Sequence, residues 1–211
     1  MINDKQVALQ TAAYLLQIKA VKLSPRDLFT WASGIKSPIY CDNRITLSFP
    51  EIRTFIMEQF CAVIKAHFEH ADLIAGVATG GIAQGALVSQ QLELPFVYVR
   101  TTKKDHGLTN LIEGKVEAGQ RVVVVEDLIS TGKSSLEVVE ALRNAGCEVA
   151  GMLAIFTYNL PVSQDGFRDA KCPLITLTDY DILVEQALST NYITEEDLTV
   201  LKAFKENLTK K

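Results

Sequence analysis

A continuous run of β-branched residues that ends in two acids, RVVVVED at 121–127, constrains the fold of this chain more than any other segment. Four consecutive valines leave no alternation of apolar and polar positions, which is typical of a strand buried on both faces of a parallel sheet. An amphipathic helical pattern over 133–145 follows this strand and stops at Gly146. We therefore expect a strand–helix unit whose acids lie at the end of the strand, where open α/β sheets bind their ligands.

The neighbouring segments repeat this order of strand and helix, which indicates a doubly wound, mainly parallel sheet flanked by helices. The N-terminal part differs: a helical stripe over 5–20 precedes aromatic residues, Gly and Pro over 27–47, which predict short strands and turns. The sequence SFPE at 48–51 is typical of a capping box with Pro in the first turn of a helix. The other strands are predicted at 72–77, 95–100, 147–158 and 173–179, and the other helices at 82–92, 180–188 and 194–208.

The composition of the chain indicates one globular unit. It has 211 residues, 48% of them hydrophobic, and a formal net charge of −4. This size fits an α/β core over 68–211 that includes C-terminal helices, with an N-terminal helix and hood over 1–67 packed on it. The apolar content argues against disorder, and the acidic balance argues against a nucleic-acid partner. We expect a cytoplasmic protein with no membrane partner, because the sequence has neither a membrane-length apolar run nor a signal-peptide pattern.

The turn after the valine strand combines small hydroxyl residues with a glycine, over 130–134. Free N–H groups and the dipole of the following helix favour a phosphate there. Glu126 and Asp127 can accept hydrogen bonds from vicinal hydroxyls, so a ribose 5-phosphate fits the spacing. A Walker A loop would need its first glycine where Asp127 stands, and a carboxylate there would repel a triphosphate. The other alternative is a capped helix with incidental surface acids.

Residues 122–134 resemble the signature with which type I phosphoribosyltransferases bind 5-phosphoribosyl 1-diphosphate (PRPP), and the resemblance extends over roughly 68–160. The segments FTWASGIKSPIYCDNR at 29–44 and RTTKKDHG at 100–107 resemble the orotate phosphoribosyltransferases in particular. The resemblance implies transfer of 5-phosphoribosyl from PRPP to N1 of orotate, giving orotidine 5′-monophosphate and pyrophosphate. Another base phosphoribosyltransferase, and a PRPP-sensing regulator on the same fold, are the alternatives.

The resemblance also implies a cofactor, a partner and individual site residues. Mg²⁺ would be held by PRPP and waters rather than directly by the protein, and the partner would be a second copy whose lid, over 100–110, reaches the neighbouring site. The loop GVATGGIAQG at 76–85 would bind pyrophosphate. Catalytic roles fall on Lys104, His106 and Asp127, and orotate contacts fall on Ser130, Lys36 and Tyr40. PRPP contacts fall on Arg100, Lys103, Lys104, His106, Glu126, Asp127, Leu128, Ile129, Ser130, Thr131, Gly132, Lys133 and Ser134. Departures from some family members occur at Ala32, Gly80, Thr101 and Tyr158.

Overall fold

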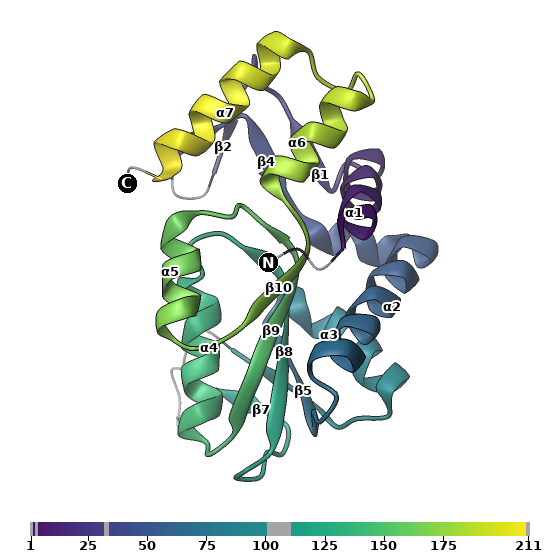
Figure 1. Ribbon diagram of the computed structural model, residues 1–211, viewed down its shortest axis with the longest axis vertical. Coiled ribbons are helices and arrows are strands. Elements are labelled where there is room, and N and C mark those ends of the chain that lie inside the picture. The colour runs from purple at the N-terminus through teal and green to yellow at the C-terminus, as the bar shows by residue number, and fades with distance from the viewer. Residues whose placement is uncertain (1, 3, 32–33, 101–110, 210–211) are drawn as a thin grey trace.

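A six-stranded sheet forms the centre of the computed structural model, which describes residues 2, 4–31, 34–100 and 111–209. Its strands are β5 (Leu73–Val77), β6 (Phe96–Val99), β7 (Ile112–Glu113), β8 (Arg121–Ile129), β9 (Glu148–Thr157) and β10 (Leu174–Asp179). Their order is β10-β9-β8-β5-β6-β7, in which β7 pairs antiparallel with β6 and the other neighbours pair parallel (Figure 1). The predicted doubly wound, mainly parallel sheet is therefore confirmed. Its topological switch point lies between β5 and β8, where a ligand is expected at the carboxyl ends of the strands.

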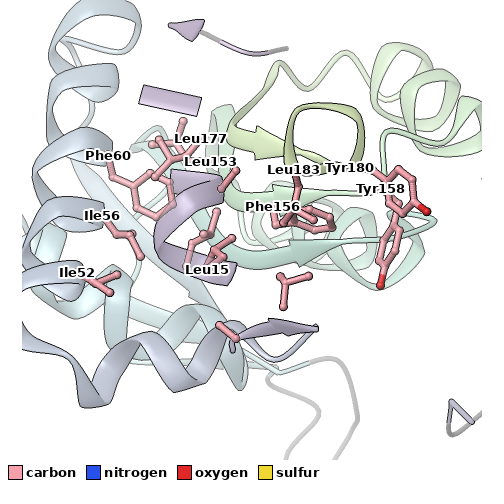
Figure 2. Packing of buried hydrophobic residues seen from close by; sticks show 14 of the residues in the cluster. Leu15, Ile52, Ile56, Phe60, Leu153, Phe156, Tyr158, Leu177, Tyr180 and Leu183 are labelled. Atoms are coloured by element: carbon pink, nitrogen blue, oxygen red, sulfur yellow. The ribbon is translucent and has the colours of Figure 1, made fainter. Parts of the chain in front are cut away.

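Helices cover both faces of the sheet (Figure 1). One face carries α1 (Lys5–Gln17), α2 (Pro50–His67) and α3 (Gly80–Leu92), and the other carries α4 (Lys133–Asn144) and α5 (Pro161–Asp169). Figure 2 shows Leu15 of α1 and Phe60 of α2 beside Leu153 of β9 in the first of these two buried clusters. On the other face, Leu142 and Phe167 pack against alternate residues of the same strands. The valine run is thus buried on both sides, as its sequence predicts.

A small hood covers the carboxyl ends of the central strands (Figure 1). It comprises β1 (Val21–Leu23), β2 (Phe29–Thr30), β3 (Lys36–Ser37), β4 (Ile39–Cys41) and the 3₁₀ helix η1 (Asn43–Ser48). The C-terminal helices α6 (Tyr180–Ser189) and α7 (Glu195–Thr209) lie beside it. The Tyr180 hydroxyl donates to the carbonyl of Leu201 at 3.0 Å, and the rings of Trp31 and Phe204 meet edge to face at 5.9 Å. These contacts join α6, α7 and the hood into one wall.

The structure corrects two local predictions. The capping box at 48–51 is wrong, because Ser48 belongs to η1 and the residue that precedes α2 is Phe49, which makes no side-chain cap. Phe49 is extended, as steric contact with a following proline favours. The valine strand ends two residues later than predicted, since Leu128 and Ile129 continue the pairing with β9. The two acids that are predicted to bind PRPP, Glu126 and Asp127, therefore lie inside β8 rather than at its end. No helix among the described residues is long and apolar enough to span a bilayer.

Candidate active site

The turn between β8 and α4 has the backbone geometry of an anion site. Ser130 and Thr131 are exposed in it. Gly132 adopts a left-handed φ of +79° before the helix, which glycine adopts without strain, and a Cβ there would lie 2.9 Å from the Phe167 ring. The first N–H groups of α4, a helix of 12 residues, have no acceptor within the helix. The turn therefore offers backbone donors and hydroxyls to a phosphate.

The two acids that precede this turn have different environments. Glu126 is buried, with 6% of its surface exposed, whereas Asp127 is half-buried. The Asp127 N–H donates to Glu126 Oε1 at 2.9 Å, and the Ser135 hydroxyl of α4 donates to Glu126 Oε2 at 3.2 Å. Burial, followed by the proximity of Asp127, raises the pKa of Glu126 to about 9. At neutral pH, Glu126 is therefore a neutral acid, and Asp127 is the less buried of the two side chains.

The stability of a Glu126→Gln variant, compared with that of the wild type, is expected to increase as the pH rises. An unfolded glutamate loses its proton near pH 4.5, whereas the folded protein keeps it up to about pH 9. Between these values the unfolded state binds fewer protons, so the stability of the wild type falls by up to about 1.4 kcal/mol per pH unit. Melting curves from pH 5 to 9 should show the variant's Tm rising relative to that of the wild type. A constant difference over this range would contradict a neutral Glu126.

The Asp127 carboxylate lies at the switch point of the sheet, against the start of α3. A Cβ at Gly80 would collide with this carboxylate, and a Cβ at Gly81 would collide with the carbonyl oxygen of Val125. The glycine pair therefore permits α3 to approach β8 closely. Gly80, one of the four positions that depart from some family members, is the residue that makes room for Asp127. The segment 76–85, predicted as a loop, is largely the end of β5 and the first turns of α3, and the same approach brings its Gly80 beside the acid.

Asn43 connects the hood to this acid. Its side chain is 1% exposed, and its Nδ2 donates to the carbonyl oxygen of Asp127 at 2.7 Å. The Thr46 hydroxyl donates to the carbonyl of Asn43, also within η1, at 2.6 Å. The bond from Asn43 therefore fixes the hood relative to the strand that carries Asp127.

A cavity of about 390 Å³ opens between the hood and the ends of β8 and β9. It contains two of the predicted orotate residues, Ser130 and Tyr40, and the third, Lys36, donates from Nζ to the Thr30 hydroxyl at its rim, at 2.7 Å. Its lining is Thr30, Trp31, Tyr40, Cys41, Leu128, Ser130 and Tyr158. The aromatic side chains offer flat surfaces to a planar base, and Ser130 also belongs to the phosphate turn.

The polar groups in the cavity wall are uncharged. Tyr158 is 3% exposed, and burial raises its pKa well above the usual range. Its ring packs edge to face against Trp31 and Phe156. Burial also raises the pKa of the Cys41 thiol, which donates to Asn43 Oδ1 at 3.3 Å. These two side chains can contribute shape and neutral hydrogen bonds to a ligand, but no charge.

The residues predicted to bind diphosphate are only partly described. Arg100 lies just after β6, where its N–H donates to the carbonyl of Leu111 at 2.9 Å and its Nε lies 3.2 Å from Glu113 Oε1. The Glu113 contact places the guanidinium beside β7, at the start of the predicted lid. Thr101, Lys103, Lys104 and His106 lie outside the described residues, as does Ala32 of the hood.

Two residues that contact the acid pair are absent from the sequence-based prediction: Asn43 and Ser135. Asn43 belongs to the polar run CDNR, which follows a short strand in the segment 29–44. That run could have indicated Asn43 as a site residue, because polar residues that follow a strand of the hood can face the core. Ser135 gave no such signal, since a serine in the first turn of a helix is common in any protein.

Comparison with known proteins identifies the family. A family model described as "Phosphoribosyl transferase domain" matches residues 54–182. A protein from Bacteroides fragilis named orotate phosphoribosyltransferase is 57% identical over 196 residues, which cover 93% of this chain and 92% of that relative. The chain belongs to the orotate phosphoribosyltransferase family. A second orotate phosphoribosyltransferase, from Streptococcus agalactiae, is 53% identical over 201 residues, covering 95% of this chain and 96% of the relative.

The fold agrees with this family. The crystal structure of orotate phosphoribosyltransferase from Aeropyrum pernix matches with a TM-score of 0.75 and 27% identity, and the match covers 87% of this chain and 99% of that one. The type I phosphoribosyltransferase fold predicted from residues 122–134 is therefore confirmed. As a member of the orotate phosphoribosyltransferase family, this chain is an enzyme of the transferase class.

Proposed function

We propose that this enzyme transfers the 5-phosphoribosyl group from PRPP to N1 of orotate, giving orotidine 5′-monophosphate and pyrophosphate. The observation that carries the proposal is the position of Ser130, which lines the cavity under the hood and also begins the phosphate turn. One ligand can therefore place a planar base in the cavity and its 5-phosphate on the N-terminus of α4. Asp127 lies two residues before the end of the same strand, where the ribose would connect the two.

In this proposal, Asp127 is the acid that acts on the ribose. Its carboxylate accepts hydrogen bonds from the ribose hydroxyls, while the segment 128–134 holds the 5-phosphate. The bond from ribose C1 to the diphosphate stretches before the bond to orotate forms, so the sugar develops positive charge. A fixed carboxylate beside the ribose stabilises that charge. Glu126 holds the Asp127 N–H and thereby orients the strand end.

Positive charge for the departing diphosphate comes from the other side of the site. Arg100 follows β6, and we propose that Lys103, Lys104 and His106 approach the diphosphate together with it and exclude water. Exclusion of water prevents hydrolysis of the activated sugar. The loop at 76–85 would offer backbone N–H groups to the same phosphates. We further propose that the active form is a homodimer in which these lid residues act in the neighbouring site.

The described residues fit a magnesium ion that binds together with its substrate. No group of three or more His, Cys, Asp or Glu side chains within them could hold a metal ion alone. Asp127 provides a single half-buried carboxylate, which can accept hydrogen bonds from metal-bound waters, and the remaining oxygen ligands would come from PRPP. When bound, Mg²⁺ neutralises part of the diphosphate charge.

An orotate assay tests the proposed function. Mixed with PRPP, Mg²⁺ and orotate, the protein is expected to consume orotate, followed by the loss of its absorbance, and to release one pyrophosphate per orotate. Turnover of another base in place of orotate would assign the enzyme to a different phosphoribosyltransferase activity. Binding of PRPP and a nucleic acid without turnover of any base would instead support a regulator.

A further inference from the structure

The cavity under the hood needs a cation that its own wall does not supply. Orotate carries a carboxylate, and burying a carboxylate without a partner is strongly unfavourable. The described residues that line the cavity are aromatic, aliphatic or neutral polar side chains. Tyr158 and Cys41 remain protonated at neutral pH, because burial raises the pKa of each. Among the described residues, a cation can therefore reach the base only from beside this lining, and Lys36 at the rim and Arg44 after η1 begins are the two cations of the hood near it.

Arg44 has the position for this role. It follows Asn43, whose amide donates to the Asp127 carbonyl, so its backbone is fixed beside the ribose acid. The Arg44 guanidinium donates two parallel hydrogen bonds to the Asp42 carboxylate, which form a fork: Nε to Oδ1 at 2.7 Å and Nη2 to Oδ2 at 2.9 Å. The bonds and charge of Asp42 raise the pKa of Arg44 most, and the fields of Asp127 and Tyr40 raise it further. Arg44 therefore directly follows the residue that contacts the backbone of Asp127, and it lies three and four positions after the cavity residues Cys41 and Tyr40.

The chemistry of orotate places its carboxylate at the same junction. The carboxylate is attached to C6, next to N1, and N1 is the atom that becomes bonded to ribose C1. The carboxylate must therefore lie where the base meets the ribose. Tyr40 and Cys41 line the base cavity, and Asn43 contacts the backbone of Asp127, so the segment that leads into Arg44 runs along that junction.

The guanidinium of Arg44 has donors left for a ligand. The fork to Asp42 uses two of the five N–H donors that an arginine carries. The Arg44 side chain is 58% exposed and Asp42 fixes its plane, which suits bidentate recognition of a carboxylate. By contrast, Lys36 is held through Thr30 within the hood.

We propose that Arg44 is the specificity-determining residue for orotate: it binds the C6 carboxylate at the junction of base and ribose, and Asp42 orients it. This inference rests on the proposed function, because it assigns a role within the orotate reaction. It distinguishes orotate and its nucleotide from pyrimidines that lack the carboxylate.

Calorimetric titration of the full chain with two nucleotides tests the inference. Orotidine 5′-monophosphate and uridine 5′-monophosphate differ in the C6 carboxylate, and the wild type is expected to prefer the former. Arg44→Gln keeps a polar side chain next to Asp42 but removes the charge. It should weaken binding of orotidine 5′-monophosphate by about 10- to 100-fold, the loss expected for a hydrogen bond to a charged group. Binding of uridine 5′-monophosphate should change less than about threefold, as for a contact that this ligand does not make.

Two further variants keep the result interpretable. Arg44→Lys restores the charge without the planar fork and should recover part of the lost preference, even if the glutamine variant folds poorly. Arg26→Ala removes an exposed arginine that pairs with Glu196 and Asp197, and should leave both affinities unchanged. Equal losses for both nucleotides, or an unchanged preference in Arg44→Gln, would overturn the inference. Failure of the wild type to bind orotidine 5′-monophosphate would instead overturn the proposed function.

Discussion

Replacing Asp127 with asparagine is expected to lower kcat/KM for the orotate reaction by about 100-fold or more, as for loss of one preorganised electrostatic group. Asp127 is the less buried acid of the pair, and its carboxylate packs against Gly80 at the start of α3. Asparagine keeps the size of the side chain but removes the charge that would stabilise the cationic sugar. Steady-state kinetics with PRPP and orotate, varied separately, measure the loss. Full activity in this variant would remove Asp127 from the mechanism.

Glu126→Gln is the matched control for this change. Glu126 is already neutral at neutral pH, and an amide oxygen can still accept the Asp127 N–H. We expect a decrease of less than about tenfold, the scale of one neutral hydrogen bond. Asp127→Asn and Glu126→Gln would then lower kcat/KM to different extents, because the Glu126 carboxyl group is buried and neutral whereas that of Asp127 is proposed to contact the ribose. Equal losses in the two variants would mean that both acids act on the ribose as carboxylates.

Replacing Gly81 with alanine is expected to lower the Tm by about 2–12 °C. The new Cβ would collide with the carbonyl oxygen of Val125 and would lie 3.1 Å from the Cα of Glu126. These are backbone atoms of the central strand, so α3 or β8 must move as a whole to relieve the contact. Overpacking of this kind costs about 1–3 kcal/mol, and each kcal/mol corresponds to about 2–4 °C in a chain of this size. Differential scanning calorimetry measures the shift.

Gly166→Ala provides the comparison for a tolerated glycine. A Cβ there would lie 3.0 Å from Cδ1 of Leu136, the far end of a flexible side chain. Alanine is also favoured over glycine within a helix such as α5 by about 1 kcal/mol. The Tm should stay the same or rise slightly. If both variants lost the same stability, the close approach of α3 to β8 would not explain the effect at Gly81.

Much of the fold follows from patterns that are local in the sequence. The valine run predicts a strand buried on both faces, and the order of strands and helices predicts a parallel sheet with its ligands at one edge. The end of β8 could not be predicted in this way. Leu128 and Ile129 belong to the strand because they pair with Phe156 and Thr157 of β9, and such pairing depends on the register between two distant segments.

Of the candidate site, too, only the parts that are local in the sequence could be predicted. The phosphate turn and its acids are contiguous, so their residue types and spacing predict an anion and a ribose. The different environments of Glu126 and Asp127 come from Ser135 and Gly80, which belong to two helices on opposite faces of the sheet. Nothing in the order of two adjacent acids indicates which one will be buried. Similarly, the contact of Asn43 with Asp127 joins residues 84 positions apart.

If the cavity holds the base as proposed, the contact between Trp31 and Phe204 gives α7 an influence on base selection. Trp31 forms part of the cavity wall, and its ring meets the Phe204 ring of α7 edge to face, whereas no α7 residue is among the described residues that line the cavity. The position of Trp31, and with it the size of the cavity, therefore depends on Phe204, a residue 173 positions further along the chain. A substitution of Phe204 could therefore change the size of base that the cavity accepts, although no cavity-lining residue is replaced.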